Sequence, residues 1–231
     1  MNLPMNTPTD TQAHIHNHIC QNFDGIQNWF KAVTKRLAYP IYSSYDIRDS
    51  GYKVTNVDAN VYPAGFNNIC PTDKENAVDL FKKYINIHYP FNVKRILLIT
   101  EEHTKNLYYL ENVYTISDLI QQAGFEVRLA FPKELSEVLN LETATGHKLQ
   151  FGSGFENSAW VKDFKPDLII SNNDFSLSLQ DWGQQMTKPM NPPRGLGWYQ
   201  RKKSRYFKNY NQLVLNFHNL QKYPSFHQTA R

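Results

Sequence analysis

The stretch "VKRILLIT", residues 93–100, decides the fold that we expect for this chain of 231 residues. Its run of consecutive apolar residues is typical of a strand that is buried on both faces of a sheet. The stretches "FEVRLAF" at 125–131 and "DLIIS" at 167–171 predict two more strands. A helix is expected between the first two strands, from about residue 106 to residue 122, because Gly124 suits the end of a helix.

Strands that alternate with helices predict an α/β fold, in which a mostly parallel sheet is flanked by helices. Apolar residues that recur every three or four positions indicate a helix at 19–37, and shorter helices are expected at 76–87 and 176–186. Residues 41–70 have the aromatic, glycine-containing composition of strands joined by shaped loops. The stretch "TGHKLQFG" at 145–152 is typical of an inserted hairpin strand.

We expect a short leader and one domain. Residues 1–20 mix Pro, Thr, Asn and His without periodicity, which predicts a disordered segment. Residues 21–231 are expected to form a single α/β domain. This domain should end in a long basic helix that begins near Trp198.

The charged residues are unevenly distributed along the chain. All 21 Asp and Glu residues lie at or before Asp181, whereas nine of the 25 Lys and Arg residues follow it. A segment whose charged residues are all basic is expected to bind an anion or an acidic partner surface. The basic run "RKKSRYFK" at 201–208 leaves a non-catalytic anion- or RNA-binding module open as an alternative function, although no zinc finger or RNA-recognition signature accompanies it.

The sequence predicts a cytoplasmic protein. No stretch reaches the run of about 18 apolar residues that a membrane helix needs, and the leader lacks the basic-then-apolar order of a secretory signal. The two cysteines, Cys20 and Cys70, are therefore expected to be reduced. His14, His16, His18 and Cys20 are metal-binding in type, but alternate residues of a leader are poor geometry for zinc, and we expect no metal there.

Polar side chains follow two of the expected strands at the point where each strand ends. His103 lies in "TEEHTKN" at 100–106, with Glu101 or Glu102 to orient it, and "NNDFS" begins at Asn172. Because ligands bind at the carboxyl ends of strands in open α/β sheets, we expect a site there. Structural roles remain open, since His103 could be a surface residue and Asp174 a helix cap. The polar residues after the second strand are Asn172, Asn173 and Asp174.

Two earlier stretches offer further candidates. "YDIRDSGYK" at 45–53 contains an arginine, which is the natural clamp for a carboxylate or phosphate, although an exposed strand with salt bridges is the competing interpretation. "VDANVYPAGFNNIC" at 57–70 gathers small polar side chains around a tight turn, and predicts either a structural loop or a pocket wall. The candidates are Asp46, Arg48 and Lys53 in the first stretch and Asp58, Asn60, Asn67 and Asn68 in the second.

Four blocks of the sequence together resemble the proteobacterial glutamate–cysteine ligases of the type first recognised in iron-oxidising bacteria. They occur in the family's order and cover residues 25–220 approximately. The resemblance implies a fold like that of glutathione synthetase, in which an α/β domain precedes an ATP-grasp domain. The blocks are "SSYDIRDSGYKVTNVDANVYPAGFNNIC", "EEHTKNLYYLENVYTISDLIQQAGFEVRL", "LIISNNDFS" and "PPRGLGWYQRKKSRYFKNYNQL".

The resemblance implies the ATP-dependent formation of γ-glutamylcysteine from glutamate and cysteine, the first step of glutathione biosynthesis. Members of this family are nearly twice as long as this chain. We therefore expect a truncated amino-terminal half that is inactive or nearly so alone, with the main ATP and Mg²⁺ site in the missing half, which could be a separate chain. Nucleic acid and membrane are not expected partners.

Such a reaction needs cations near the reacting carboxylate and polar groups that hold the amino acids in line. We expect Arg48, Lys53, Arg194 and Arg201 to act on the anionic groups as catalytic residues. The residues expected to bind substrate are Asp46, Asp58, Asn60, Asn67, Asn68, His103, Asn172, Asn173 and Asp174.

Overall fold

A computed structural model describes residues 8–35, 37, 39–50, 54–176, 180–197 and 202–221. The chain divides into two compact units, and the single domain expected at 21–231 stays a prediction. The first unit consists of Met1–Ala38, Tyr45–Ala59 and Arg201–Arg231, and the second of Tyr39–Ser44 and Asn60–Gln200.

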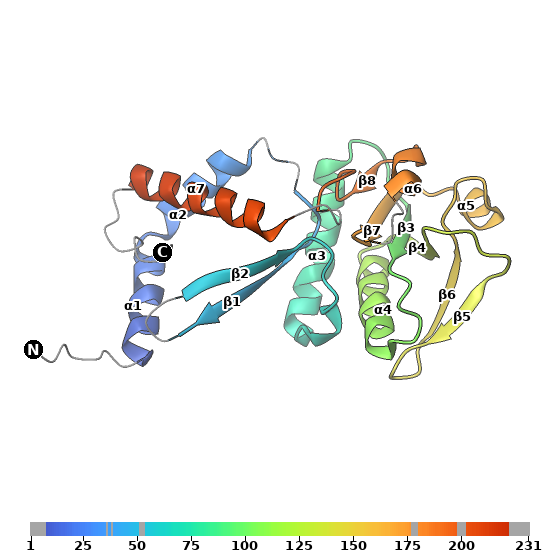
Figure 1. Cartoon of the computed structure of the whole chain (residues 1–231), viewed down its shortest axis with the longest axis horizontal. Coiled ribbons are helices and arrows are strands. Elements are labelled where there is room, and N and C mark those ends of the chain that lie inside the picture. Colours follow the sequence, from blue (N-terminus) through green and yellow to red (C-terminus); the bar gives the residue numbers. More distant parts are fainter. Residues whose placement is uncertain are drawn as a thin grey trace, which may run out of the picture. The chain divides into compact units, whose positions relative to one another are not determined.

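A six-stranded sheet in the order β5-β6-β4-β3-β7-β8 forms the centre of the second unit (Figure 1). β3 (Arg95–Thr100) pairs in parallel with β4 (Glu126–Phe131) on one side and with β7 (Leu168–Asn172) on the other. β6 pairs in parallel with β4, and β8 pairs in parallel with β7. β5 is antiparallel to β6. The predicted α/β class with a mostly parallel sheet is therefore confirmed. The remaining strands are β5 (Leu139–Glu142), β6 (Lys148–Ser153) and β8 (Met190–Asn191).

The central strand β3 is covered on both faces, as its apolar sequence predicts. Ile96 and Leu98 lie in a core with α3 and α4, whereas Leu97 and Ile99 lie in a second core with α5 and α6. Successive side chains of a strand face opposite ways, so one apolar run serves both layers. Burial of each such side chain contributes about 1.5–3 kcal/mol to the free energy of unfolding. The helices are α3 (Pro71–His88), α4 (Leu107–Gln122), α5 (Ala159–Phe164) and α6 (Gln180–Gln185).

Local signals at both ends fix the bounds of α4. Asn106 precedes the helix, and its Oδ1 accepts the backbone N–H of Tyr109 at 3.1 Å, which pairs one of the N–H groups that a helix start leaves free. Gly124 has a φ of +97° beyond the last turn, and its N–H donates to the Gln121 carbonyl at 2.9 Å. This glycine therefore ends the helix as predicted.

The described residues of the first unit include three helices and a two-stranded sheet. The Trp29 ring of α2 packs edge-on against Phe217 of α7, with 4.6 Å between ring centroids. The long basic helix that the sequence predicts is present as α7. The elements are α1 (Pro8–Gln21), α2 (Phe23–Thr34), β1 (Ser44–Asp49), β2 (Val54–Asn60) and α7 (Lys203–Gln221).

The amino-terminal helices differ from our expectations. Helix α1 occupies most of the segment that we expected to be disordered. Pro8 stands at its first position, where a missing N–H costs nothing, and His18 stands in its last turn, where a basic group interacts favourably with the helix dipole. The single helix expected at 19–37 is interrupted at Asn22, whose Nδ2 donates to the His18 carbonyl at 2.8 Å.

Gly152 provides a test of the packing on β6. A Cβ added there would lie 2.1 Å from the Trp160 ring, which a 2.9 Å hydrogen bond from Nε1 to the Leu129 carbonyl holds in place. We expect Gly152→Ala to lower the free energy of unfolding by about 1–3 kcal/mol, as overpacking does, when measured by urea denaturation. Gly65→Ala is the control, because its added Cβ would have a nearest neighbour at 3.9 Å. Equal stability of the two variants would contradict this account.

Candidate functional site

The ends of β3 and β7 place two polar loops side by side. Thr100 and Asn172 are direct partners in the parallel pairing of these strands. The segments that follow them, 101–106 and 173–176, therefore leave the sheet at the same edge. This is the edge at which open α/β sheets bind ligands, and the sequence predicted a site there.

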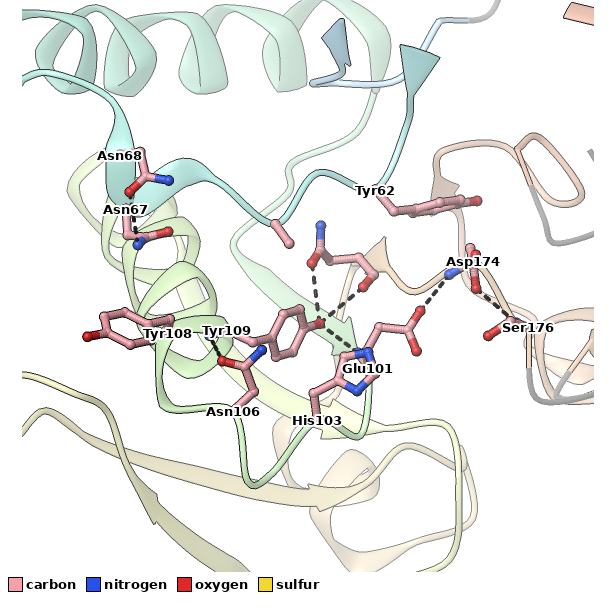
Figure 2. Close-up of a pocket in the computed structure, with 12 residues that line it drawn as sticks. Tyr62, Asn67, Asn68, Glu101, His103, Asn106, Tyr108, Tyr109, Asp174 and Ser176 are labelled. Atoms are coloured by element: carbon pink, nitrogen blue, oxygen red, sulfur yellow. Dashed lines mark hydrogen bonds between the residues drawn. The ribbon is translucent and has the colours of Figure 1, made fainter. Parts of the chain in front are cut away.

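A cavity of about 560 Å³ opens between these two loops and the segment 62–68 (Figure 2). Small-molecule sites have volumes of about 300–1,000 Å³, so the cavity is large enough for a metabolite. Its walls come from the second unit. Five of the predicted site residues line it: Asn67, Asn68, His103, Asn172 and Asp174.

Asn172, at the end of β7, forms hydrogen bonds to the two other parts of the cavity wall, the segment 62–68 and helix α4. It is 1% exposed, and its Nδ2 donates to the Pro63 carbonyl at 3.0 Å and to the Tyr42 hydroxyl at 3.3 Å. Its Oδ1 accepts from the Tyr109 hydroxyl at 3.4 Å. Burial raises the pKa of both tyrosines, so their hydroxyls keep their protons. One amide thus connects β7 to the turn at Pro63 and to helix α4.

Glu101, the first residue beyond β3, is held from two directions. Its backbone N–H donates to the Tyr109 hydroxyl at 2.8 Å, and its Oε1 accepts the backbone N–H of Asp174 at 3.0 Å. Burial raises the pKa of the Glu101 carboxyl, and the Asp174 N–H offsets part of this effect. The sequence predicts for Glu101 only a role in orienting His103. The signal that could have selected it is its position directly after a buried strand.

Two predicted site residues bind the backbone around the cavity. Asn173 is 2% exposed, and its Nδ2 donates to the Thr100 carbonyl at 3.0 Å. Its Oδ1 accepts the N–H of Phe175 at 2.7 Å, where the backbone has a φ of +58°. The Oδ1 of Asn60 accepts the N–H of Tyr62 at 2.8 Å. Such local bonds shape turns, and neither residue lines the cavity.

Arg194 binds the carbonyl-rich end of α6. Its Nε donates to the Gly183 carbonyl at 3.0 Å, and its Nη2 donates to the carbonyls of Lys188, at 2.6 Å, and Met186. An arginine commonly stabilises a helix end in this way. These bonds occupy the guanidinium within the fold, and its expected action on an anion stays a prediction.

The remaining candidates do not line the cavity. Asp46 and Arg48 are exposed on β1, and Asp58 on β2 forms an ion pair with Lys203 of α7 at 3.2 Å. All three belong to the first unit, and their expected roles stay predictions. Outside the described residues lie Lys53 and Arg201.

In the part of the chain that the structure describes, no three or more His, Cys, Asp or Glu side chains are grouped to hold a metal ion. None of the helices in the described ranges is both long enough and apolar enough to cross a membrane. In α1 the Sγ of Cys20 lies 3.6 Å from the Nε2 of His16. Cys20 and Cys70 are both free thiols.

The hydrogen bonds of Asn172 predict the effect of a substitution. Asn172→Asp replaces the Nδ2 donor by an oxygen that faces the Pro63 carbonyl. We expect the free energy of unfolding to fall by about 1–3 kcal/mol at neutral pH, because buried acceptors are left without a donor. Burial favours the protonated carboxyl, which can donate again, so the loss should shrink as the pH falls. Urea denaturation between about pH 4 and pH 8 measures both effects.

Asn106→Asp is the matched control. Asn106 uses its Oδ1 to cap α4, and Asp is an equally good cap, so we expect stability to change by no more than about 0.5 kcal/mol. Equal losses in the two variants would contradict the role that we assign to Asn172.

Comparison with known proteins identifies the family. Residues 16–226 match the model of the family described as GshA, glutamate–cysteine ligase. The fold is similar to that of a protein assigned as a gamma-glutamylcysteine synthetase from Methylobacillus flagellatus KT, with a TM-score of 0.82 and 30% sequence identity. This similarity covers 95% of the present chain and 53% of the other, so the chain spans about half the length of that relative. No curated protein matches. Because the family match covers most of the sequence, the chain belongs to the glutamate–cysteine ligase family.

Proposed function

We propose that this chain is the amino-acid-binding half of a cytoplasmic, ATP-dependent glutamate–cysteine ligase, which forms γ-glutamylcysteine in the first step of glutathione biosynthesis. The observation that carries the proposal is the polar cavity at the ends of β3 and β7, in a chain that belongs to this family. The substrates of the complete enzyme would be glutamate, cysteine and ATP.

The side chains of the cavity suit an amino acid. Glu101 and Asp174 contribute carboxylates, and Asn67, Asn68 and Asn106 contribute amides. Carboxylates pair with an ammonium group, and amide N–H groups donate to a carboxylate. Polar groups placed in this way fix the orientation of a small ligand, which is what a ligase needs in order to align two substrates.

The same lining does not suit a nucleotide. Proteins bind phosphate groups with basic side chains or with glycine-rich loops at helix N-termini, and no Lys or Arg lines the cavity within the described ranges. We therefore propose that ATP and Mg²⁺ bind mainly in an ATP-grasp domain. That domain would correspond to the part of the Methylobacillus relative that this chain does not cover, on the same or a separate chain. The residues that line the cavity would bind and orient the amino acids.

The proposal predicts that the 231-residue chain does not complete the reaction alone. With glutamate, cysteine, ATP and Mg²⁺, we expect no release of ADP above background, because the residues that would hold the nucleotide are not among those of the cavity. The full-length Methylobacillus relative is the positive control in the same assay. Clear turnover by this chain alone would contradict the proposed division of the site.

A second prediction concerns the turn at 57–70. We expect Asn67→Ala and Asn68→Ala each to weaken glutamate or cysteine binding about three- to tenfold, the effect of losing one hydrogen bond, with little change in thermal stability. Isothermal titration calorimetry and thermal unfolding measure the two quantities. Asn157→Ala, on an exposed residue of the turn before α5, is the control and should change neither. Lost stability with unchanged affinity would return this turn to a structural role.

A further inference from the structure

We infer that Glu101 and Asp174 bind the α-ammonium group of glutamate, so that this cavity is the glutamate site and not the cysteine site of the ligase. The inference rests on the proposed function. It specifies which of the two amino acids binds in the cavity, and which side of the cavity its ammonium group faces.

The two carboxylates of the cavity lie on a different side from three of its amides. Figure 2 shows Glu101 and Asp174 on one side, and Asn67, Asn68 and Asn106 on the other. An amino acid carries an ammonium group and a carboxylate that need opposite partners. The acidic side matches the ammonium group, and the N–H groups of the amide side match a carboxylate. The cavity thus has the polarity of an amino-acid zwitterion.

The two carboxylates are neighbours, and each uses one oxygen within the fold. The Oε1 of Glu101 accepts the backbone N–H of Asp174 at 3.0 Å, and the Oδ1 of Asp174 accepts the backbone N–H of Ser176 at 2.9 Å. Neighbouring carboxylates disfavour each other's charge unless a cation lies close to both. An ammonium group, with three N–H donors, can bind the second oxygen of each.

His103 is the basic side chain that lines the cavity among the described residues, and it lowers the pKa of Glu101 in part. No Lys or Arg lines the cavity there, and no salt bridge of the described chain includes Glu101 or Asp174. The adjacent Glu102 differs, because its Oε2 lies 2.5 Å from the Nζ of Lys133. Burial raises the pKa of the Glu101 carboxyl, so a bound cation would favour its ionised form. Because neither Lys nor Arg lines the cavity among the described residues, the ammonium group of a ligand would add positive charge to that of His103.

The chemistry of ligation decides between the two amino acids. The new bond joins the activated γ-carbonyl carbon of glutamate to the cysteine nitrogen, and phosphate leaves that carbon. The cysteine amine must lose its proton before it can attack, whereas the α-ammonium group of glutamate takes no part and stays protonated. Carboxylates stabilise the protonated form of an amine. Glu101 and Asp174 would hinder a bound cysteine, but they suit glutamate.

Tyr109 is a positioning residue in this arrangement. Its buried hydroxyl accepts the Glu101 N–H at 2.8 Å and donates to Asn172 at 3.4 Å. It therefore ties the first residue beyond β3 to the last residue of β7. Glu101 is held at the edge of the sheet before any ligand binds.

Isothermal titration of the 231-residue chain with four ligands tests the inference. The ligands are L-glutamate, N-acetyl-L-glutamate, glutarate and L-cysteine. We expect glutamate to bind at least tenfold more tightly than the other three. Glutarate lacks the amine, and in N-acetyl-L-glutamate acetylation removes the positive charge of the amine. Cysteine has no distal carboxylate.

Glu101→Gln keeps the size of the side chain and an acceptor for the Asp174 N–H, but removes the charge. We expect it to weaken glutamate binding at least tenfold and not to weaken glutarate binding. Glu102→Gln is the matched control, one residue away and paired with Lys133, and should bind glutamate as the parent does. Thermal unfolding reports whether each variant folds, and Asp174→Asn provides the same test if Glu101→Gln does not fold.

The outcomes separate this inference from the proposed function. Equal binding of glutamate and glutarate, or full affinity of Glu101→Gln for glutamate, would overturn the ammonium site and leave an amino-acid pocket in place. Cysteine binding that is lost in Glu101→Gln would overturn the choice of glutamate. Failure of every amino acid to bind would overturn both the inference and the proposed role of the cavity.

Discussion

The parallel pairing of β3 with β7 is the constraint on which the site depends. It sets Thr100 opposite Asn172, so the loops that carry Glu101 and Asp174 begin side by side. Side chains alternate between the faces of a strand, and a shift of one residue in this register would turn Asn172 away from Pro63 and Tyr109. The apolar layers on both faces of β3 hold the register, because a slip would expose residues that are now fully buried.

Elements with a strong local signature could be predicted from the sequence. β3, β4 and β7 are apolar runs, and α4 ends at a glycine, so their burial and backbone requirements are visible in the residues themselves. β5, β8 and α5 were not predicted. β8 has two residues and exists only because β7 offers it a partner, and such short elements depend on tertiary contacts. Helix α1 was missed because its polar composition has no apolar period.

The site could be located from the sequence, but the partner of each side chain could not. Polar residues at strand ends predicted the edge of the sheet. Asn172 and Asn173 are adjacent and identical in type, yet Asn172 lines the cavity while Asn173 bonds the backbone of Thr100 and Phe175. The role of Glu101 in the cavity depends on its hydrogen bond with Asp174, which is distant in the sequence. Residue type shows which bonds a side chain can make, and the fold decides which bonds it makes.

Under the proposed function, the charge of the cavity divides the work of ligation between two regions. A phosphate-bearing group needs cations, and the carboxylates of Glu101 and Asp174 would repel it. The ammonium group of glutamate would compensate much of that negative charge when it binds. An occupied cavity would therefore oppose a phosphate group less than an empty one. Apart from His103, the polar groups of the described cavity walls are mainly acids, amides and hydroxyls, so Lys or Arg residues that do not line the cavity would then have to stabilise the developing charge on the γ-carboxylate.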